Sequence, residues 1–568
     1  MPDIGPLVYT LLCIGLLTNG LAQPPADMPS FRPPVNHAMR LSGTFGELRT
    51  GHFHAGLDIK SEKGTWGDPV FSVDDGYIAR IVVSPSGFGK ALYINHPQSG
   101  LTTVYGHLQE FDAPLQSYVY AAQKDQESFA LDLTLPKEKF PVKKGDKIAL
   151  MGSTGFSFGP HLHFEVRKTL SEERINPALH HLRLEDHQEP TLTGLTLYHL
   201  DHQLIEYRRE EFPSSELHSD DTLSTDAWRI GLGIEAFDPH NAGRNKNGIY
   251  SATIKLDSDT IYHFSMDSMS VKDGLYFNAQ VDYERMVSDG SKIYRCYRLP
   301  TDQSSIHRLS YRDGIIPLYR DRVQKVTASI SDLSGNKINQ SFFIRRAEKV
   351  SPIDRPVYQY HIKAGIPDTI RSSYLEVIWP ANALYQDCYL QYSSGPSSAP
   401  GVYSAQYRLD RDRLPLFHPL QLKIRPFPFP DSLRNKLTIV QVDIDGKQRN
   451  RPAKWIGSWL GCSISRLGTY QVVADTIPPT IDLISKRSSD QSERLEFTIS
   501  DNLPGPGGLK FNASLNDRWV LAEYDLKRDR VTCQINRSEW EKGSYQFKLL
   551  VEDTVGNVSE YEYRLHFK

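Results

Sequence analysis

Residues 161–166 read His161-Leu-His-Phe-Glu-Val166, a strict alternation of polar and apolar side chains. A period of two is typical of a β-strand, because residues two apart project from the same face. His161 and His163 are therefore predicted to face one site, while the apolar residues between them face a core. Taken alone, the pattern also suits the polar outer face of a half-buried strand.

Short alternating runs of apolar residues also surround this strand, from Phe45 to Pro177. Short apolar runs such as Val70-Phe-Ser-Val73 and Ile78-Ala-Arg-Ile-Val-Val83 are separated by turn residues such as Asp75-Gly76. Short alternating runs with turns between them are typical of hairpins. This part of the chain is predicted to be an antiparallel β domain.

Two later segments look like copies of one β unit. One ends in a strand and the turn Asp332-Leu-Ser-Gly-Asn336, the other in a strand and the turn Asp553-Thr-Val-Gly-Asn557. In both, a second alternating strand follows, which predicts a hairpin that closes a sandwich. The segment between them ends at the stiff joint Thr476-Ile-Pro-Pro479 and is predicted to be a third β unit.

The predicted fold class is mainly β, with an N-terminal antiparallel β-sheet domain followed by about three β-sandwich domains. The alternation and the many aromatic residues of these sandwiches resemble bacterial immunoglobulin-like modules. The proline-rich residues after the N-terminus are predicted to form an extended leader outside any core. The predicted divisions are an export signal at 1–22, the leader or linker at 23–42, the first β domain at 43–184, and sandwich modules at 189–348, 351–475 and 479–568.

Composition excludes some classes of partner. The 568 residues carry 65 Lys and Arg against 68 Asp and Glu, a formal net charge of -3, so the chain lacks the basic field of a nucleic-acid binder. The apolar run Leu7 to Leu17, followed by Gly20-Leu-Ala22, predicts an export signal cleaved before Gln23. The run is too short to span a bilayer and no later stretch is apolar enough. We therefore expect an exported protein of the periplasm or cell envelope that is not an integral membrane protein.

The four cysteines after the signal are widely spaced and form no Cys-x-x-Cys pair, which excludes a zinc ribbon. Cys388 and Cys462 fall in one predicted module, and the sequence leaves open whether they form a disulfide.

Metal-binding side chains recur in two further places. The stretch His52-Phe-His-Ala-Gly-Leu-Asp58 puts the His54 imidazole and the Asp58 carboxylate four residues apart, and both groups suit zinc. His107 ends another apolar run. Each motif is weak alone. With the histidine pair they supply what a catalytic zinc site needs: three ligands, an open position and groups that move protons.

These residues resemble the signature of the lysostaphin-like, or LytM-type, peptidoglycan metallopeptidases: His-x-x-x-Asp followed by His-x-His. The resemblance covers roughly Gly43 to Pro177 and includes Phe45-Gly-Glu-Leu-Arg49, Lys144-Gly-Asp-Lys147 and Gly152-Ser-Thr-Gly155. It implies that His54, Asp58 and His163 bind Zn²⁺. It also implies that His107 and His161 are catalytic and flank the attacking water; which of them is the general base stays open.

The chain departs from the family pattern in two places. Phe158 stands where the family more often has a small hydroxyl residue. An insertion from about Gln109 to Phe140 is either a wall of the groove or a surface loop, and we favour the loop because long surface loops cost little. The stretch Gly155-Phe-Ser-Phe-Gly159 also spells the nucleophile elbow of serine hydrolases, but a strand follows it where an elbow needs a helix.

The resemblance implies a zinc metalloendopeptidase that hydrolyses peptide cross-links of bacterial peptidoglycan during cell-wall remodelling. The alternative is a non-catalytic LytM-type scaffold or activator of another wall hydrolase, against which the complete ligand set argues. The C-terminal modules show no spacing of a metal or nucleophile site. They are candidates for binding an envelope protein partner, and inhibition of the groove is a further hypothesis.

Overall fold

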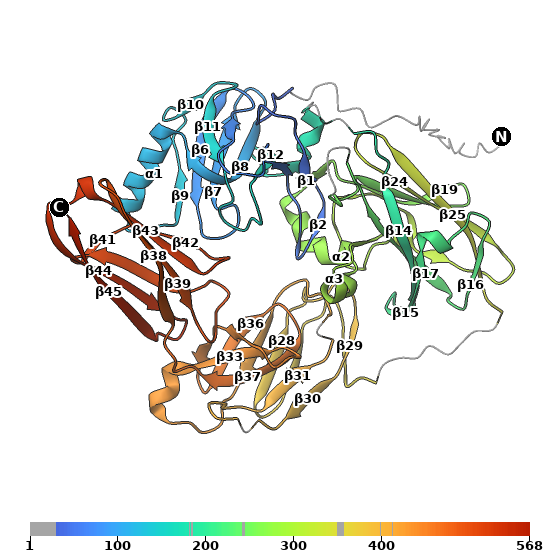
Figure 1. Cartoon of the computed structure of the whole chain (residues 1–568). Coiled ribbons are helices and arrows are strands. Elements are labelled where there is room, and N and C mark those ends of the chain that lie inside the picture. The colour runs from blue at the N-terminus through green and yellow to red at the C-terminus, as the bar shows by residue number, and fades with distance from the viewer. Residues whose placement is uncertain are drawn as a thin grey trace, which may run out of the picture.

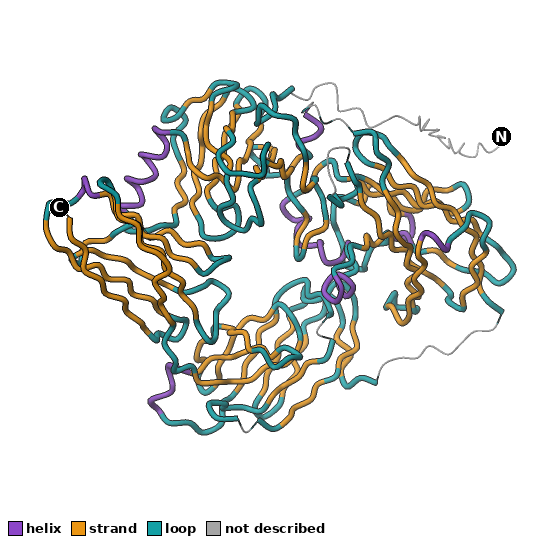
Figure 2. The backbone as a smooth tube through the Cα atoms, in the orientation of Figure 1, coloured by secondary structure: helices purple, strands orange, loops and turns teal. Residues whose placement is uncertain are grey.

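The computed structural model describes residues 30–180, 182, 184, 186–240, 245–348, 357–397, 399–411 and 413–567. The predicted export signal and the start of the leader lie outside these residues. Strands dominate the described chain, as Figure 2 shows, and the prediction of a mainly β fold is confirmed. None of the described helices has the length and apolar character needed to cross a membrane.

The first unit, residues 30–184, is built on one large sheet with the order β1-β4-β12-β8-β7-β6-β10. The alternation of the histidine strand is realised in β12, where Leu162, Phe164 and Val166 are fully buried. The elements are β1 (Leu41–Gly43), β2 (Leu48–Arg49), β3 (His52–Phe53), β4 (Leu57–Lys60), β5 (Pro69–Phe71), β6 (Gly76–Val83), β7 (Lys90–His96), β8 (Leu101–Phe111), α1 (Ala113–Asp125), β9 (Leu131–Thr134), β10 (Pro141–Val142), β11 (Lys147–Met151), β12 (His161–Lys168), β13 (Arg174–Ile175) and the 3-10 helix η1 (Pro177–His180).

The second unit, residues 186–348, has two sheets whose inward side chains share one core. The sheet of the first unit continues into it, because β13 pairs with β20. The elements are β14 (Thr191–Leu200), β15 (Glu206–Pro213), η2 (Ser214–Glu216), β16 (Thr222–Thr225), β17 (Arg229–Phe237), β18 (Ser251–Leu256), β19 (Asp259–Ser265), β20 (Ser268–Met269), η3 (Val271–Tyr276), α2 (Phe277–Gln280), α3 (Tyr283–Asp289), β21 (Ile293–Arg295), β22 (His307–Ser310), η4 (Tyr311–Gly314), β23 (Ile316–Pro317), β24 (Gln324–Ser331) and β25 (Lys337–Arg346).

The third unit, residues 357–475, pairs the sheet β27-β28-β32-β36-β35 with the sheet β30-β31-β37-β33-β34. Cys388 and Cys462 are buried free thiols in its core, not a disulfide. The elements are β26 (Tyr360–Ile362), β27 (Asp368–Arg371), β28 (Leu375–Trp379), β29 (Cys388–Leu390), β30 (Tyr392–Gly395), β31 (Gln406–Leu409), β32 (Leu420–Ile424), η5 (Asp431–Lys436), β33 (Leu437–Val442), β34 (Gln448–Arg451), β35 (Lys454–Ile456), β36 (Trp459–Ile464) and β37 (Gly468–Ala474).

The fourth unit, residues 479–567, packs the sheet β38-β39-β43-β42 against β41-β40-β44-β45. The hairpins predicted from the two repeated turns are confirmed, since β24 pairs with β25 and β44 with β45, each antiparallel. The elements are β38 (Thr480–Ser488), β39 (Ser492–Ser500), β40 (Lys510–Leu515), β41 (Arg518–Trp519), β42 (Ala522–Asp525), β43 (Arg530–Asn536), η6 (Arg537–Glu539), β44 (Gly543–Glu552) and β45 (Val558–Phe567).

Two predictions about the first unit are wrong. The leader was expected outside the core, yet Phe31 and Val35 are buried in it. Two large apolar side chains gain more from burial than an extended proline-rich segment loses by docking. The insertion after Gln109 is not a surface loop: it forms α1 and β9, and Leu115 and Leu131 join the same core.

The four units follow one another around a ring, which the contacts between the fourth and first units close (Figure 1). On the first unit these contacts involve α1, where Lys124 Nζ and Tyr120 Oη donate to the Glu539 carboxylate at 2.6 and 2.8 Å. The third unit meets the second through Tyr385 and the fourth through Lys436. Each unit therefore has two neighbours.

Candidate metal centre

Three neighbouring strands carry the predicted site. In the order β4-β12-β8, the register sets His163 opposite Asp58 on one side and opposite Gly106 on the other. His54 lies just before β4, in the bend that leads out of the β2–β3 hairpin. Sequence positions more than a hundred residues apart are thus fixed by the hydrogen-bond register of the sheet.

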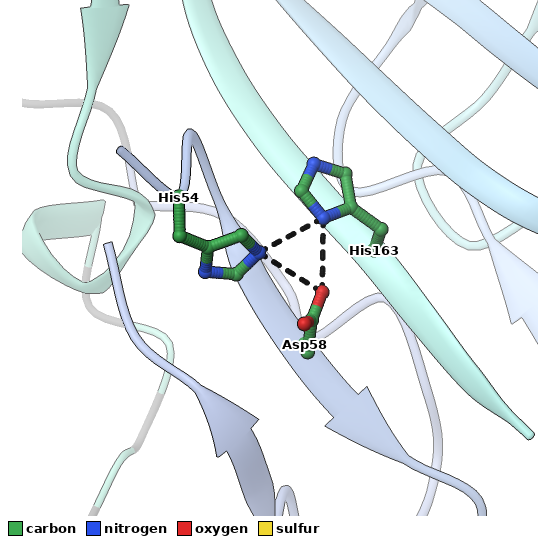
Figure 3. A group of neighbouring side chains, drawn as sticks. All are labelled: His54, Asp58 and His163. Atoms are coloured by element: carbon green, nitrogen blue, oxygen red, sulfur yellow. Dashed lines mark hydrogen bonds and ion pairs between the residues drawn. The ribbon is translucent and has the colours of Figure 1, made fainter. Parts of the chain in front are cut away.

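The side chains of His54, Asp58 and His163 converge (Figure 3). His54 Nε2 lies 3.0 Å from both Asp58 Oδ1 and His163 Nδ1, and His163 Nδ1 lies 2.9 Å from Asp58 Oδ1. All three residues are almost completely buried. These are the three ligands implied by the family resemblance, and each offers one atom to a common point.

The outer atoms of the three side chains are held by further groups. His54 Nδ1 donates to the Thr44 carbonyl at 2.8 Å, and His163 Nε2 donates to Glu165 Oε1 at 2.9 Å. Arg49 Nη2 donates to Asp58 Oδ2 at 2.6 Å. Such contacts select the tautomer and orient the ring of a metal-binding histidine.

The consequence is electrostatic. With the outer N–H groups of His54 and His163 engaged by acceptors, their inner nitrogens present lone pairs. Those lone pairs and Asp58 Oδ1 face one another in a buried space, and only a cation or a proton relieves the repulsion. The donor set of two imidazoles and one carboxylate fits zinc.

The close approach of these side chains shifts the pKa values of His163 and Asp58. Burial alone would lower the pKa of His163, but the hydrogen bonds to Asp58 and Glu165 raise it to about 9. Although burial opposes ionisation of Asp58, the three imidazoles of His54, His161 and His163 hold its pKa well below the usual range.

His107 and His161 flank this group. Their ring centroids are 4.7 Å apart, and His161 Nε2 lies 3.5 Å from Asp58 Oδ1. His107 Nδ1 donates to the Thr154 carbonyl at 2.8 Å and His161 Nδ1 to the Gly159 carbonyl at 2.9 Å, so in each ring Nε2 carries the lone pair that can accept a proton. Burial, and then the neighbouring His161 and His163, lower the pKa of His107 to about 3.

A local irregularity aims His107 into the site. Its backbone φ is 60°, a left-handed conformation that is uncommon for residues other than glycine. The pairing of β7 with β8 shifts register between Leu92 and Lys90, so that β8 carries an extra residue there. A bulge of this kind redirects a side chain, and such strain is commonly found at functional sites.

The site opens into a cavity of about 1620 Å³. Its wall includes all five predicted site residues, and the second unit adds residues such as Met269, Val271 and Lys292. Phe158, the residue that departs from the family pattern, is 90% exposed on the loop before His161 and also lines the cavity. Among the described residues, the insertion and the third and fourth units contribute nothing to this wall.

Sequence reasoning missed the groups that hold the ligands. Glu165 continues the face of His161 and His163 in β12, so the alternation contains the signal that would have found it. Arg49 belongs to the family-like stretch Phe45-Gly-Glu-Leu-Arg49, but the resemblance implies no role for it. Phe88, whose ring stacks on His163 at 4.8 Å, carries no signal in the sequence.

The part of the chain that carries the predicted site residues matches a known family. The model of peptidase family M23 matches residues 52–124 and 130–177. Lipoprotein NlpD of Yersinia enterocolitica is 32% identical over 114 residues, which are 20% of this chain and 90% of that protein. The chain belongs to peptidase family M23.

Further relatives match about a quarter of this chain. The DD-carboxypeptidase/endopeptidase Mpg of Neisseria meningitidis is 32% identical over 144 residues, 24% of this chain and 26% of Mpg. The chain spans about a quarter of the length of the first curated relatives it matches. The structure of a zinc-containing peptidase from Vibrio cholerae matches at 30% identity with a TM-score of 0.18. The match covers 24% of this chain and 37% of the Vibrio chain. A Zu5-like domain matches residues 359–475, outside the M23 domain.

Proposed function

We propose that this protein is an exported zinc metalloendopeptidase that hydrolyses peptide cross-links of bacterial peptidoglycan in the periplasm or cell envelope. The observation that carries the proposal is the buried convergence of His54, Asp58 and His163, each with its outer atom held by another group. Membership of family M23 and the similarity to a protein named DD-carboxypeptidase/endopeptidase support the substrate class.

In this proposal His54 Nε2, Asp58 Oδ1 and His163 Nδ1 hold Zn²⁺. Zinc in this position would supply Lewis-acid polarisation of the scissile carbonyl and a more acidic water. The hydrogen bonds that Thr44 and Glu165 accept from the histidines, and the one that Arg49 donates to Asp58, keep the three ligands in place, so little reorganisation is needed when substrate enters.

His107 and His161 move the proton and stabilise charge. Each has its Nδ1 fixed on a carbonyl and a lone pair on Nε2, the arrangement of a neutral imidazole that accepts a proton or, once protonated, donates to an oxyanion. The depressed pKa of His107 keeps it neutral at physiological pH in the metal-free site. The roles of base and oxyanion donor are interchangeable between the two on this geometry.

The test is release of soluble muropeptides from purified peptidoglycan by the mature protein, with zinc content measured on the same sample. We expect about one zinc ion per chain, release that a chelator abolishes and added zinc restores, and loss of both zinc and release in His163→Ala. His566→Ala, which removes an exposed histidine on β45, is the matched control and should behave as the wild type.

Zinc binding without release from any peptidoglycan would refute the enzymatic proposal and favour the alternative, a scaffold or activator that uses the same cavity for binding.

A further inference from the structure

A second kind of ligand group lies outside the M23 site, at the start of the fourth unit. Asp475, Asp501 and Asp553 each place a carboxylate oxygen within 4.8 Å of the other two. Asp475 lies at the end of the third unit, Asp501 directly follows β39, and Asp553 directly follows β44. Three separate segments thus bring their carboxylates together where the two units meet. We call these residues the C-terminal aspartate trio.

This trio is short of hydrogen-bond donors. Asp475 is 1% exposed, and its Oδ2 has no hydrogen-bond partner in the described chain. Asp501 is half-buried, and its Oδ1 is likewise a buried atom without a hydrogen-bond partner in the described chain. Burial and the neighbouring carboxylates raise the pKa of both residues. Buried carboxylate oxygens that face one another without donors are costly unless a cation satisfies them.

The turn after β44 holds the trio in place. Asp553 Oδ1 accepts from the backbone N–H groups of Val555 and Asn557 at 2.9 and 2.8 Å. The side-chain amide of Asn557 donates to Asp553 Oδ2 at 2.6 Å and to the Asp475 carbonyl at 3.1 Å. The turn therefore fixes Asp553 and ties it to the segment that carries Asp475.

The same arrangement recurs at the start of the second unit. Asp186, Asp238 and Asp332, the N-terminal aspartate trio, also lie within 4.8 Å of one another and line a cavity. The side-chain amide of Asn336 donates to Asp332 Oδ2 at 2.7 Å and to the Asp186 carbonyl at 3.3 Å, as Asn557 does in the fourth unit.

Their positions in the fold are equivalent. Asp186 precedes Pro190 by four residues, as Asp475 precedes Pro479. Asp238 directly follows β17, and Asp332 directly follows β24. The repeat thus preserves three carboxylates and the amide that buttresses them.

We propose that the C-terminal aspartate trio binds a calcium ion at the junction of the third and fourth units. The trio offers oxygen atoms alone, which suit a hard cation, and carboxylates on separate loops leave room for the carbonyl and water ligands that complete a calcium shell. By the same geometry, the N-terminal trio binds a second ion at the junction of the first and second units.

Calcium at the C-terminal aspartate trio would therefore fix the angle between the third and fourth units, and the fourth unit contacts the M23 domain. Lys527, on the turn after β42, donates to the carbonyls of Ser153 and Ser157 at 3.0 and 2.6 Å, on the loop before His161. An ion at the C-terminal trio stiffens the connection through which this contact is made.

The test is equilibrium dialysis of the zinc-loaded mature protein against radioactive calcium. We expect one ion bound for each trio, loss of one ion in Asp501→Asn, and loss of the other in Asp238→Asn. Asp490→Asn, which changes an exposed aspartate between β38 and β39, should bind as the wild type. Melting without calcium checks that each variant is folded, and the rise in Tm on adding calcium should be smaller in Asp501→Asn.

Absence of bound calcium in the wild type overturns the proposal, and so does a folded Asp501→Asn variant that binds as much calcium as the wild type. A single ion that Asp501→Asn removes supports the C-terminal site and refutes the N-terminal one. A single ion that only Asp238→Asn removes overturns the C-terminal site.

Discussion

Glu165 has no role as a metal ligand or proton carrier, yet zinc affinity should depend on it. Its side chain is fully buried, accepts from His163 Nε2 at 2.9 Å and forms an ion pair with Arg167 at 2.6 Å. Replacement by glutamine keeps the shape but removes the charge that fixes the His163 tautomer. Loss of such a partner typically lowers metal affinity 10- to 100-fold, or about 1.4 to 2.7 kcal/mol.

The assay is competition for zinc between the protein and a chromophoric chelator, beside muropeptide release. Glu165→Gln also leaves Arg167 with one carboxylate fewer, and breaking a buried pair can cost about 3 to 5 kcal/mol of stability, so melting curves must show that the variant is folded. Glu172→Gln is the matched control, because Glu172 binds the same Arg167 at 2.8 Å, is half exposed and does not touch His163. A folded Glu165→Gln variant with the zinc affinity of Glu172→Gln would refute the reasoning.

Two further predictions concern the contacts between units. Lys527→Met removes the donor to the loop before His161 and should lower muropeptide release several-fold at unchanged zinc content. The control Lys510→Met, at an exposed lysine of the same unit, should change neither quantity. A rise in release in Lys527→Met would instead support inhibition by the fourth unit. Phe45, Leu48 and Phe53 of the first unit are buried in the core of the second. A fragment ending at Leu184 exposes these three side chains, whose burial is worth roughly 4.5 to 9 kcal/mol. It should melt far below a fragment ending at residue 348 and lose zinc; equal melting temperatures and zinc contents would contradict this.

The sequence was most informative where one strand carries the pattern. The alternation of β12 predicts both the strand and the common direction of His161 and His163, since side-chain period and strand geometry coincide. The two repeated turns likewise predict their hairpins. α1 was missed because only Leu115 and Val119 mark its buried apolar face, too few to establish a helical period.

Other features depend on contacts that no local pattern contains. Phe45, Leu48 and Phe53 join the core of the second unit, which their irregular spacing in the sequence does not predict. The carbonyls that orient His54 and His107 are backbone groups, which every residue has. The predicted ligands follow from a motif, whereas the groups that position them, Glu165 excepted, required the fold.

Because the four units form a closed ring, weak contacts between the fourth and first units can matter more than their individual free energies indicate. A partly exposed ion pair such as Lys124 with Glu539 is worth at most about 1 kcal/mol and would not hold two separate proteins together. Joined through the intervening units, the two surfaces meet at an effective concentration on the order of millimolar, so these contacts form far more often than they would between separate molecules. Opening such an interface costs little free energy. Coupling between the fourth and first units can therefore be governed by the joints between successive units of the ring rather than by the strength of the contacts that close it.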